Sequence, residues 1–522
     1  MLLISPIILL LFTASAILIL PRLRPGFSSH WLLAVGGAFS AWVALLMQQS
    51  RLPLSVVLAT WRPTELFTGS PQLLVEDISW FLAVALVTLG LSVILVDVRR
   101  SANADSSEWA FALALVALGI LAVYSGNWLT LGLALILIDA SVLIMLWLRT
   151  PDDMSRRQLL AGFSANLIAV AILISGMVLL EPGWITVDGF ATSTSLTNLL
   201  FIFAIGIRLG IAIAGIGQES INSLNRNLGT LVQFVPAAAT LTIIVRITLN
   251  SPLNLTSRYL IVISMLASVY GAVRWARAKD SLRGRPFWIF ALVFLALAAA
   301  LQEHPGAALA LGSILLYGGA FLSLTYQESR RTLPPAILLF FAVSTLPFSP
   351  TFVIAEAVAA SSQSIQFGLL FSYGLILFGI IRHVLAFERK HIGFERWVEL
   401  IYYLGVALLP LTFIGVNVWV NTPANLRLGL LLWRPAVLSL GMAAIFTLLV
   451  WRGVRIPAIL ISATDIVFSF RWLLRLIERG TRGLERLTKL LNALLEGEGG
   501  MLWALLLVAL LVSFLVQFRA GG

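Results

Sequence analysis

The stretch YSGNWLTLGLALILIDASVLIMLW, residues 124–147, decides the class of fold. It is apolar over a length that crosses a bilayer as an α-helix, and it carries one carboxylate, Asp139, well inside the run. An ionisable side chain at that depth is costly, so by default it marks a functional site or a paired structural charge. A second apolar run, residues 199–217, carries one cation, Arg208, at a similar depth. The first question about function is therefore whether these two opposite charges meet.

The composition is that of a membrane protein with many spans. Of the 522 residues, 59% are hydrophobic and only 11% are charged. The long apolar runs predict helices, because strands of a membrane barrel alternate polar and apolar residues over about ten residues. The net charge of +11 is explained by basic loops on one side of a membrane, so no nucleic-acid partner is expected. The sequence predicts an all-α polytopic membrane protein whose surroundings are the lipid bilayer.

The sequence offers no recognisable site for a cofactor, a metal or a catalytic nucleophile. Cysteine is absent, and the four histidines lie far apart, so neither thiolate sites nor closely spaced histidine ligands are expected. We find no P-loop and no nucleophile triad. We therefore expect no cofactor and no catalytic site of its own, and at most the role of a translocase subunit.

About sixteen apolar runs predict transmembrane helices, and the basic residues predict their orientation. Residues 1–107 hold the first three spans and a polar excursion whose alternating residues could form a short hairpin. Most of the 35 Lys and Arg residues fall in loops that share one side if the N-terminus lies outside. This predicts a multi-pass protein of the cell inner (plasma) membrane with both termini on the outer side.

The C-terminal part of the chain changes character. Residues 399–451 predict additional spans. Residues 457–498 repeat apolar side chains at helical spacing, with arginines on the other face. This pattern is typical of an amphipathic helix on a membrane surface, which could anchor the chain in lipid or brace a neighbouring subunit. Residues 501–518 predict a terminal transmembrane helix.

Several local patterns together resemble the antiporter-like, proton-translocating subunits of respiratory complex I, membrane-bound hydrogenases and Mrp antiporters. LLVEDISWF, residues 73–81, resembles the acidic element that opens the third span in that family. Asp139 falls where those proteins carry a fifth-span glutamate, and Arg208 where they carry a seventh-span lysine. Residues 278–283 resemble the turn before the tenth span, and residues 346–349 resemble the Pro-rich break of the twelfth. The resemblance implies a divergent member of the family.

The resemblance also implies an architecture and partners. It implies two inverted five-helix halves, residues 108–248 and 256–388, each with one broken helix. Pro236 and the pair Pro347/Pro350 are the predicted breaks, because proline removes a helix hydrogen bond. The amphipathic segment resembles the lateral helix of the largest such subunit. Its partners would be other membrane subunits of a complex I-type or hydrogenase-type assembly that translocates protons or cations.

The sequence departs from the family where protons would be carried. Gln233 lies in the eighth-span region, where the family has histidine or lysine, and the eleventh span, residues 307–324, has no lysine. Arginine cannot replace a lysine as a relay, because its guanidinium stays protonated in proteins. We therefore predict a degraded relay in which Asp139 and Arg208 form a static pair. The chain's lysines lie outside the apolar runs of the spans: Lys279, Lys390 and Lys489.

Three further residues are candidates for an ion path. Glu356 follows the Pro-rich break and could line a polar cavity or reach the interface at the end of a span. Arg382 is equally explained by snorkelling to the membrane surface, while its neighbour His383 could titrate near neutral pH. Two functions stay open on these residues: a conducting antiporter-like subunit, and a non-conducting membrane scaffold derived from that family.

Overall fold

The computed structural model describes residues 2–24, 29–57, 70–100, 106–178, 195–213, 220–221, 224–249, 256–325, 332–385, 395–420 and 430–452. These residues all belong to one compact unit, Met1–Ser469. The predicted amphipathic helix (residues 457–498) and terminal span (501–518) lie outside the described residues.

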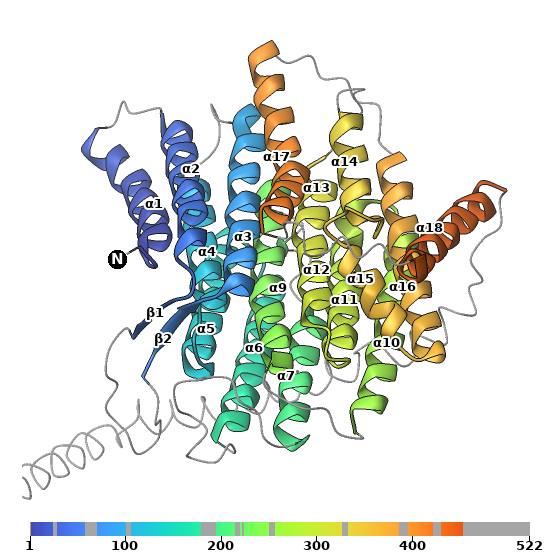
Figure 1. Ribbon diagram of the computed structural model, residues 1–522. Helices are drawn as coiled ribbons and strands as arrows, with labels where there is room; N and C mark the ends of the chain where they lie inside the picture. Colours follow the sequence, from blue (N-terminus) through green and yellow to red (C-terminus); the bar gives the residue numbers. More distant parts are fainter. Residues whose placement is uncertain are drawn as a thin grey trace, which may run out of the picture. The chain divides into compact units, whose positions relative to one another are not determined.

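The described part of the chain is built from long apolar helices and two short strands (Figure 1). Thirteen helical segments of these residues are long and apolar enough to cross a membrane, which confirms an all-α polytopic membrane protein. The helices are α1 (Ser5–Leu23), α2 (His30–Gln48), α3 (Asp77–Val96), α4 (Ser106–Val123), α5 (Trp128–Arg149), α6 (Asp153–Val178), α7 (Ser195–Ile213), α9 (Arg226–Leu249), α10 (Thr256–Arg277), α11 (Ser281–Ala300), α12 (Pro305–Ser313), α13 (Gly319–Leu324), α14 (Leu333–Val343), α15 (Phe352–Ala360), α16 (Gln363–Leu385), α17 (Arg396–Val420) and α18 (Leu430–Trp451).

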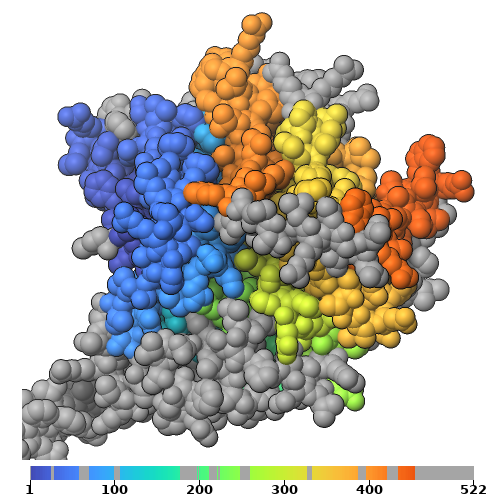
Figure 2. Space-filling model, in the orientation of Figure 1, coloured from blue at the N-terminus to red at the C-terminus, as the bar shows by residue number. Residues whose placement is uncertain are grey.

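The helices divide into a buried centre and a periphery. Helices α3, α9 and α11, with the α12–α13 segment, are covered on nearly every side, as expected of helices that are apolar all round. Helices α1, α2 and α18 bury only about a third of their side chains or fewer, so lipid or partner subunits would cover them. Helix α17 packs on α3, and its orange surface borders the blue surface of α3 in Figure 2.

The polar excursion after α2 contains the predicted strand pair. β1 (Leu54–Val57) and β2 (Gln72–Val75) are antiparallel, with Leu54 opposite Val75. β2 also holds the turn between α4 and α5, because the amide of Gly126 donates to the carbonyl of Gln72. The side chain of Asn127 then caps α5 by accepting from the amide of Thr130. The sheet thus fixes the start of the helix that carries Asp139.

The helix break predicted at Pro347 and Pro350 is present. Helix α14 ends at Val343 and α15 begins at Phe352. Between them Thr345 has φ 57° and Phe348 has φ 67°, a left-handed conformation that a right-handed helix cannot contain. The hydroxyl of Thr351 donates to the carbonyl of Ala342 and accepts from the amide of Thr345, so a side chain satisfies backbone groups that the break frees.

The break predicted at Pro236 is wrong. Helix α9 runs from Arg226 to Leu249 with Pro236 in its interior. A proline costs a helix one hydrogen bond, but neighbouring helices and hydroxyl groups can compensate in a membrane span. Helix α9 is packed on several sides, and the hydroxyl of Thr240 donates to the carbonyl of Pro236 at 2.9 Å. Packing therefore keeps the helix continuous. The division into inverted halves stays a prediction.

Helices α10 and α11 approach each other closely at a glycine. A Cβ atom at Gly271 would lie 2.8 Å from the backbone nitrogen of Ala291. One turn away, the hydroxyl of Ser268 donates to the carbonyl of Ala291 at 2.8 Å. Small residues and interhelical hydroxyl bonds are the usual means of helix association in lipid, where no hydrophobic effect drives helices together.

Candidate functional site

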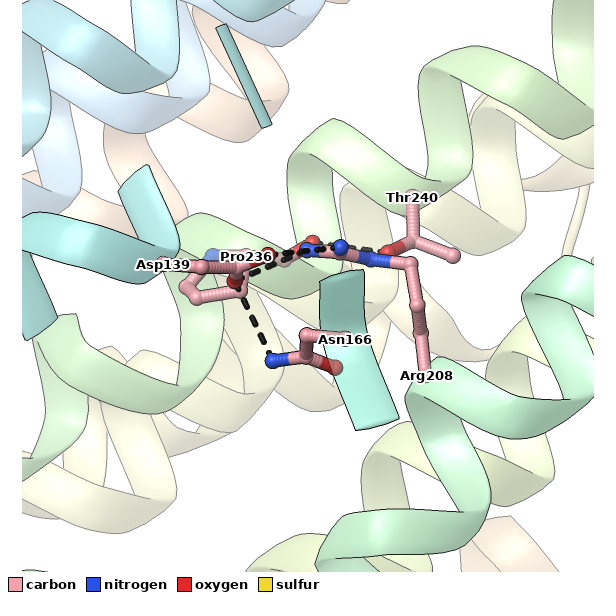
Figure 3. Close-up of polar contacts among 5 residues, drawn as sticks. All are labelled: Asp139, Asn166, Arg208, Pro236 and Thr240. Atoms are coloured by element: carbon pink, nitrogen blue, oxygen red, sulfur yellow. Dashed lines mark hydrogen bonds and ion pairs between the residues drawn. The ribbon is translucent and has the colours of Figure 1, made fainter. Parts of the chain in front are cut away.

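Asp139 and Arg208 form a buried ion pair that joins α5 to α7 (Figure 3). Nη1 of Arg208 lies 2.8 Å from Oδ2 of Asp139, and Nη2 lies 3.1 Å from Oδ1. Only 4% of the arginine side chain and 3% of the aspartate side chain is exposed. Two parallel charge-assisted hydrogen bonds are the strongest arrangement available to these groups. The two charges that the sequence places at similar depth therefore meet.

A third helix contributes to the same carboxylate. Nδ2 of Asn166, on α6, donates to Oδ1 of Asp139 at 3.2 Å, so three donors share two oxygen atoms (Figure 3). Nε of Arg208 is buried and has no hydrogen-bond partner among the described residues. The hydrogen-bonding capacity of the Asp139 carboxylate is thus met more fully than that of the Arg208 guanidinium.

A cavity of about 150 Å³ lies against this pair. Helices α5, α6, α7, α9 and α11 form its walls, which are mostly aliphatic and aromatic. Gln233 lines the cavity together with Asp139 and Arg208. Thr240 also lines it, about two turns further along α9. The cavity is roomy enough for water, but neither amide nor hydroxyl can exchange a proton as a lysine or histidine would. The structure thus brings three of the six candidate residues together.

The other three candidate residues lie apart from this cavity. Glu356, on α15, is half-buried and makes no hydrogen bond or ion pair in the part of the chain described. Arg382 and His383 occupy the last turn of α16. Nη1 of Arg382 donates to the carbonyl of Ala276. Nε2 of His383 lies 3.3 Å from the carbonyl oxygen of Trp275, and the ring centroids of His383 and Trp275 are 4.2 Å apart. These contacts cap the C-terminal carbonyls of α10, a structural use of basic side chains.

Sequence reasoning missed a second polar cluster, at the ends of α4 and α5. The carboxylate of Glu108 is buried and accepts from Arg149 and from the amide of Asn225. Nearby in sequence, the buried Asp97 accepts from the ring nitrogen of Trp109 at 3.0 Å and from Asn227 at 3.0 Å. The sequence held one signal for this cluster: its charged residues lie at the ends of successive predicted spans, on the same predicted side of the membrane.

In the acidic element before α3, Glu76 is the residue that forms an ion pair. Asp77 is exposed, whereas Oε2 of the adjacent Glu76 lies 3.0 Å from Nη1 of Arg246. Nη2 of Arg246 donates to the hydroxyl of Ser79 at 2.7 Å. Arg246 is buried in the last turn of α9, and this pair joins two of the most buried helices, α3 and α9.

The eleventh-span region contains an irregular turn in place of a lysine. A π-helical segment, η4 (Ile314–Gly318), separates α12 from α13. Tyr317 within it is fully buried and stacks on Phe413 with ring centroids 5.0 Å apart. Such π-turns recur at functional sites. No group of three or more His, Asp or Glu side chains among the described residues could hold a metal ion.

Neither a protein-family model nor a curated protein matches this sequence, but solved structures match the fold. A chain of the membrane-bound sulfane sulfur reductase, an archaeal respiratory membrane complex, aligns with a TM-score of 0.66 over 98% of this chain and 100% of that one, at 15% identity. A chain of the Mrp complex from Dietzia sp. aligns with a TM-score of 0.66 over 99% of this chain, at 12% identity, and this chain spans 63% of its length. This chain has their fold.

A chain of respiratory complex I from Thermus thermophilus aligns less closely, with a TM-score of 0.55 at 15% identity over 78% of this chain and 97% of that one. At these identities the likeness concerns the fold. It confirms, at that level, the resemblance to the antiporter-like subunits that the sequence motifs indicated.

Proposed function

We propose that this chain is an antiporter-like membrane subunit of a multi-subunit complex, of complex I or hydrogenase type, whose own proton relay is degraded. Two observations support the assembly: the similar chains come from multi-subunit membrane complexes, and the alignments extend over nearly the whole chain. The partners would be other membrane subunits, and the expected location is the inner (plasma) membrane. No cofactor is part of the proposal.

The observation that carries the degraded relay is the bidentate Asp139–Arg208 pair. A relay residue must gain and lose a proton during each cycle. The Asp139 carboxylate already accepts three hydrogen bonds, and an arginine guanidinium stays protonated in proteins. Gln233 adds no titratable group to the cavity. Water in this cavity could therefore solvate the pair without passing a proton across it.

A second candidate function is a non-conducting scaffold that holds partner subunits. It is favoured by the fixed ion pairs that join central helices, Asp139–Arg208 and Glu76–Arg246, because such pairs hold helices in register rather than switch. The two candidate functions differ in whether ions move through the part of the chain outside residues 108–248. A conducting subunit would move ions through the part of the chain from α10 to α16, whereas a scaffold would move none.

Ion flux in reconstituted vesicles tests both candidates. Purified chain in vesicles with a pH-sensitive dye inside would be given a proton gradient and, separately, a sodium gradient. We expect the variant Arg208→Gln to change flux no more than the exposed control Arg283→Gln does. Flux above that of empty vesicles in both variants supports a conducting subunit that bypasses the pair, and background flux in all samples supports the scaffold. Wild-type flux that Arg208→Gln alone abolishes would show a live relay and contradict the proposal.

A further inference from the structure

Arg285, on α11, is a buried cation without a counter-ion. It is 6% exposed, and its Nε atom is buried with no hydrogen-bond partner within the described part of the chain. Two other arginines there are similarly buried, and each is paired: Arg208 with Asp139, and Arg246 with Glu76. Arg285 makes no hydrogen bond and no ion pair with any described residue.

The nearest charges do not neutralise Arg285. The charged groups that act on it most are Arg226, which repels it, and Asp280, which attracts it. Arg226 donates to the carbonyls of Ser323 and Thr325 at the end of α13, so it stays fixed beside Arg285.

Asp280 is already engaged. It is exposed and caps α11 by accepting from the amide of Arg283 at 2.7 Å. The side chain of Arg283 lies 3.6 Å from the same carboxylate. Among the described residues, the buried guanidinium of Arg285 therefore has near it only one carboxylate, which is exposed and has other partners.

This end of the bundle is basic well beyond these two residues. The charges come from the last turns of α10 and α16 and from the first turn of α11. Arg277 and Arg382 lie close enough to repel each other. The additional cations are Arg274, Arg277, Lys279, Arg283 and Arg382. A field of this sign, at the end of membrane spans, attracts anions.

An unpaired arginine buried at the end of a span requires an anion. Its guanidinium stays protonated, and a buried charge without a partner is strongly destabilising. A planar guanidinium fork fits the oxygen atoms of a phosphate group, which it can bind with two parallel hydrogen bonds. Gly229 lies beside the guanidinium, where a Cβ atom would be 3.5 Å from Nη1.

We propose that Arg285 and Arg226 form a binding site for a phosphate group, supplied by the headgroup of an anionic phospholipid. The lipid headgroup is the expected source because the site lies where α9 and α11 begin and α10 ends, and the ends of membrane spans lie near lipid headgroups. Free inorganic phosphate has the same chemistry and is the other source. The site is independent of the proposed function, since it needs no ion flux and lies outside the cavity beside Asp139.

The test uses the full-length chain, purified in detergent and stripped of lipid. Phosphatidylglycerol, a phosphate-free galactolipid and inorganic phosphate at matched ionic strength would be added separately, and the thermal midpoint and the lipids retained in native mass spectrometry would be measured. We expect phosphatidylglycerol to raise the midpoint and to be retained, and the galactolipid to do neither. The variant Arg285→Gln should weaken phosphatidylglycerol binding by about tenfold, the loss of one charge-assisted contact. The control Arg283→Gln removes an exposed charge two residues away at the same basic end, and it should weaken phosphatidylglycerol binding far less than Arg285→Gln does.

Each outcome decides the proposal. A response of Arg285→Gln equal to that of the wild type would overturn it, as would equal retention of galactolipid and phosphatidylglycerol by the wild type. If inorganic phosphate alone reproduces the full shift, and Arg285→Gln loses it, the phosphate site stands and its source is the free anion. Should Arg285→Gln fail to fold, Arg285→Met keeps the side-chain volume without the charge, and it should fold without lipid while losing the response.

Discussion

At the Asp139 carboxylate, three donor nitrogen atoms from two side chains, Asn166 and Arg208, converge on two oxygen atoms. Neither charge could stay in the bundle alone, because an isolated ion in low dielectric loses its hydration without replacement. Removing either residue should therefore destabilise the fold by more than the intact pair stabilises it. The same logic applied to Arg285, which forms no ion pair with any acid among the described residues, leads to an external anion.

A double-mutant experiment tests whether the pair is static. Arg208→Ala should lower the free energy of unfolding by roughly 3–5 kcal/mol, because it strands a buried carboxylate. Combining Asp139→Leu with Arg208→Met should recover most of that loss, since apolar side chains of similar volume replace both charges. Denaturant or thermal unfolding in detergent, beside the yield of assembled protein, gives the comparison.

The exposed pair Arg283–Asp280, whose side chains are 70% and 50% exposed, supplies the control. Arg283→Ala should change stability by less than about 1 kcal/mol, as is usual for surface pairs. A double variant at 139 and 208 that is as unstable as Arg208→Ala alone would show that the charges do more than cancel each other.

At the scale of single helices, proline has opposite outcomes at two places. Pro347 and Pro350 lie in a real break, where two residues take left-handed conformations, whereas Pro236 lies inside a continuous helix. The difference is in the surroundings. Helix α9 is enclosed by other helices, and the segment between α14 and α15 is held open by the hydroxyl of Thr351.

The close contact of α10 and α11 gives a prediction at this scale. Gly271→Ala places a methyl group 2.8 Å from a backbone nitrogen of Ala291, so the helices must separate. We expect a loss of about 1–3 kcal/mol, the usual cost of overpacking. Gly441→Ala on α18 is the matched control, because nothing lies within 4 Å of the new methyl group, and it should leave stability unchanged or raise it by up to about 1 kcal/mol. Thermal midpoints of the two variants measure the difference, and equal midpoints would contradict the contact.

At the scale of the whole molecule, basic side chains from distant parts of the sequence gather at the same helix ends. Arg226 bonds to the end of α13, and Arg382 bonds to the end of α10. These are the ends that the loop charges assign to the inner side of the membrane. The contacts in the structure place these helix ends together, in agreement with the loop charges. The side of the membrane on which they lie stays a prediction.

Reporter fusions test that orientation. A reporter after Ser106, in the region following α3, should be active as an inside reporter, and one after Gly522 should be active as an outside reporter. A fusion after Gln302, between α11 and α12, serves as an internal reference and should report outside. Finding the reporters after Ser106 and Gly522 on the same side would refute the predicted arrangement.

The sequence by itself determined the helical membrane class, most of the spans, the strand pair before α3 and the break near Pro347. Each of these depends on neighbours along the chain, such as an apolar run, an alternation or a proline pair. Sequence also placed Asp139 and Arg208 at matching depth, which made their contact a reasonable hypothesis. Likewise Gln233 was singled out because its type departs from the family, and it proved to line the same cavity.

Only the tertiary structure decided which side chains meet. The third donor to Asp139, the pairing of Glu76 rather than Asp77 with Arg246, and the continuity of α9 through Pro236 all depend on helices packed from distant parts of the chain. Arg285 is the clearest case, since in sequence it is one of several arginines at the start of a span, and only its packing shows that it is buried without an ion pair among the described residues. The physical reason is that hydropathy is a local property, whereas the cost of a buried charge is set by what surrounds it in three dimensions.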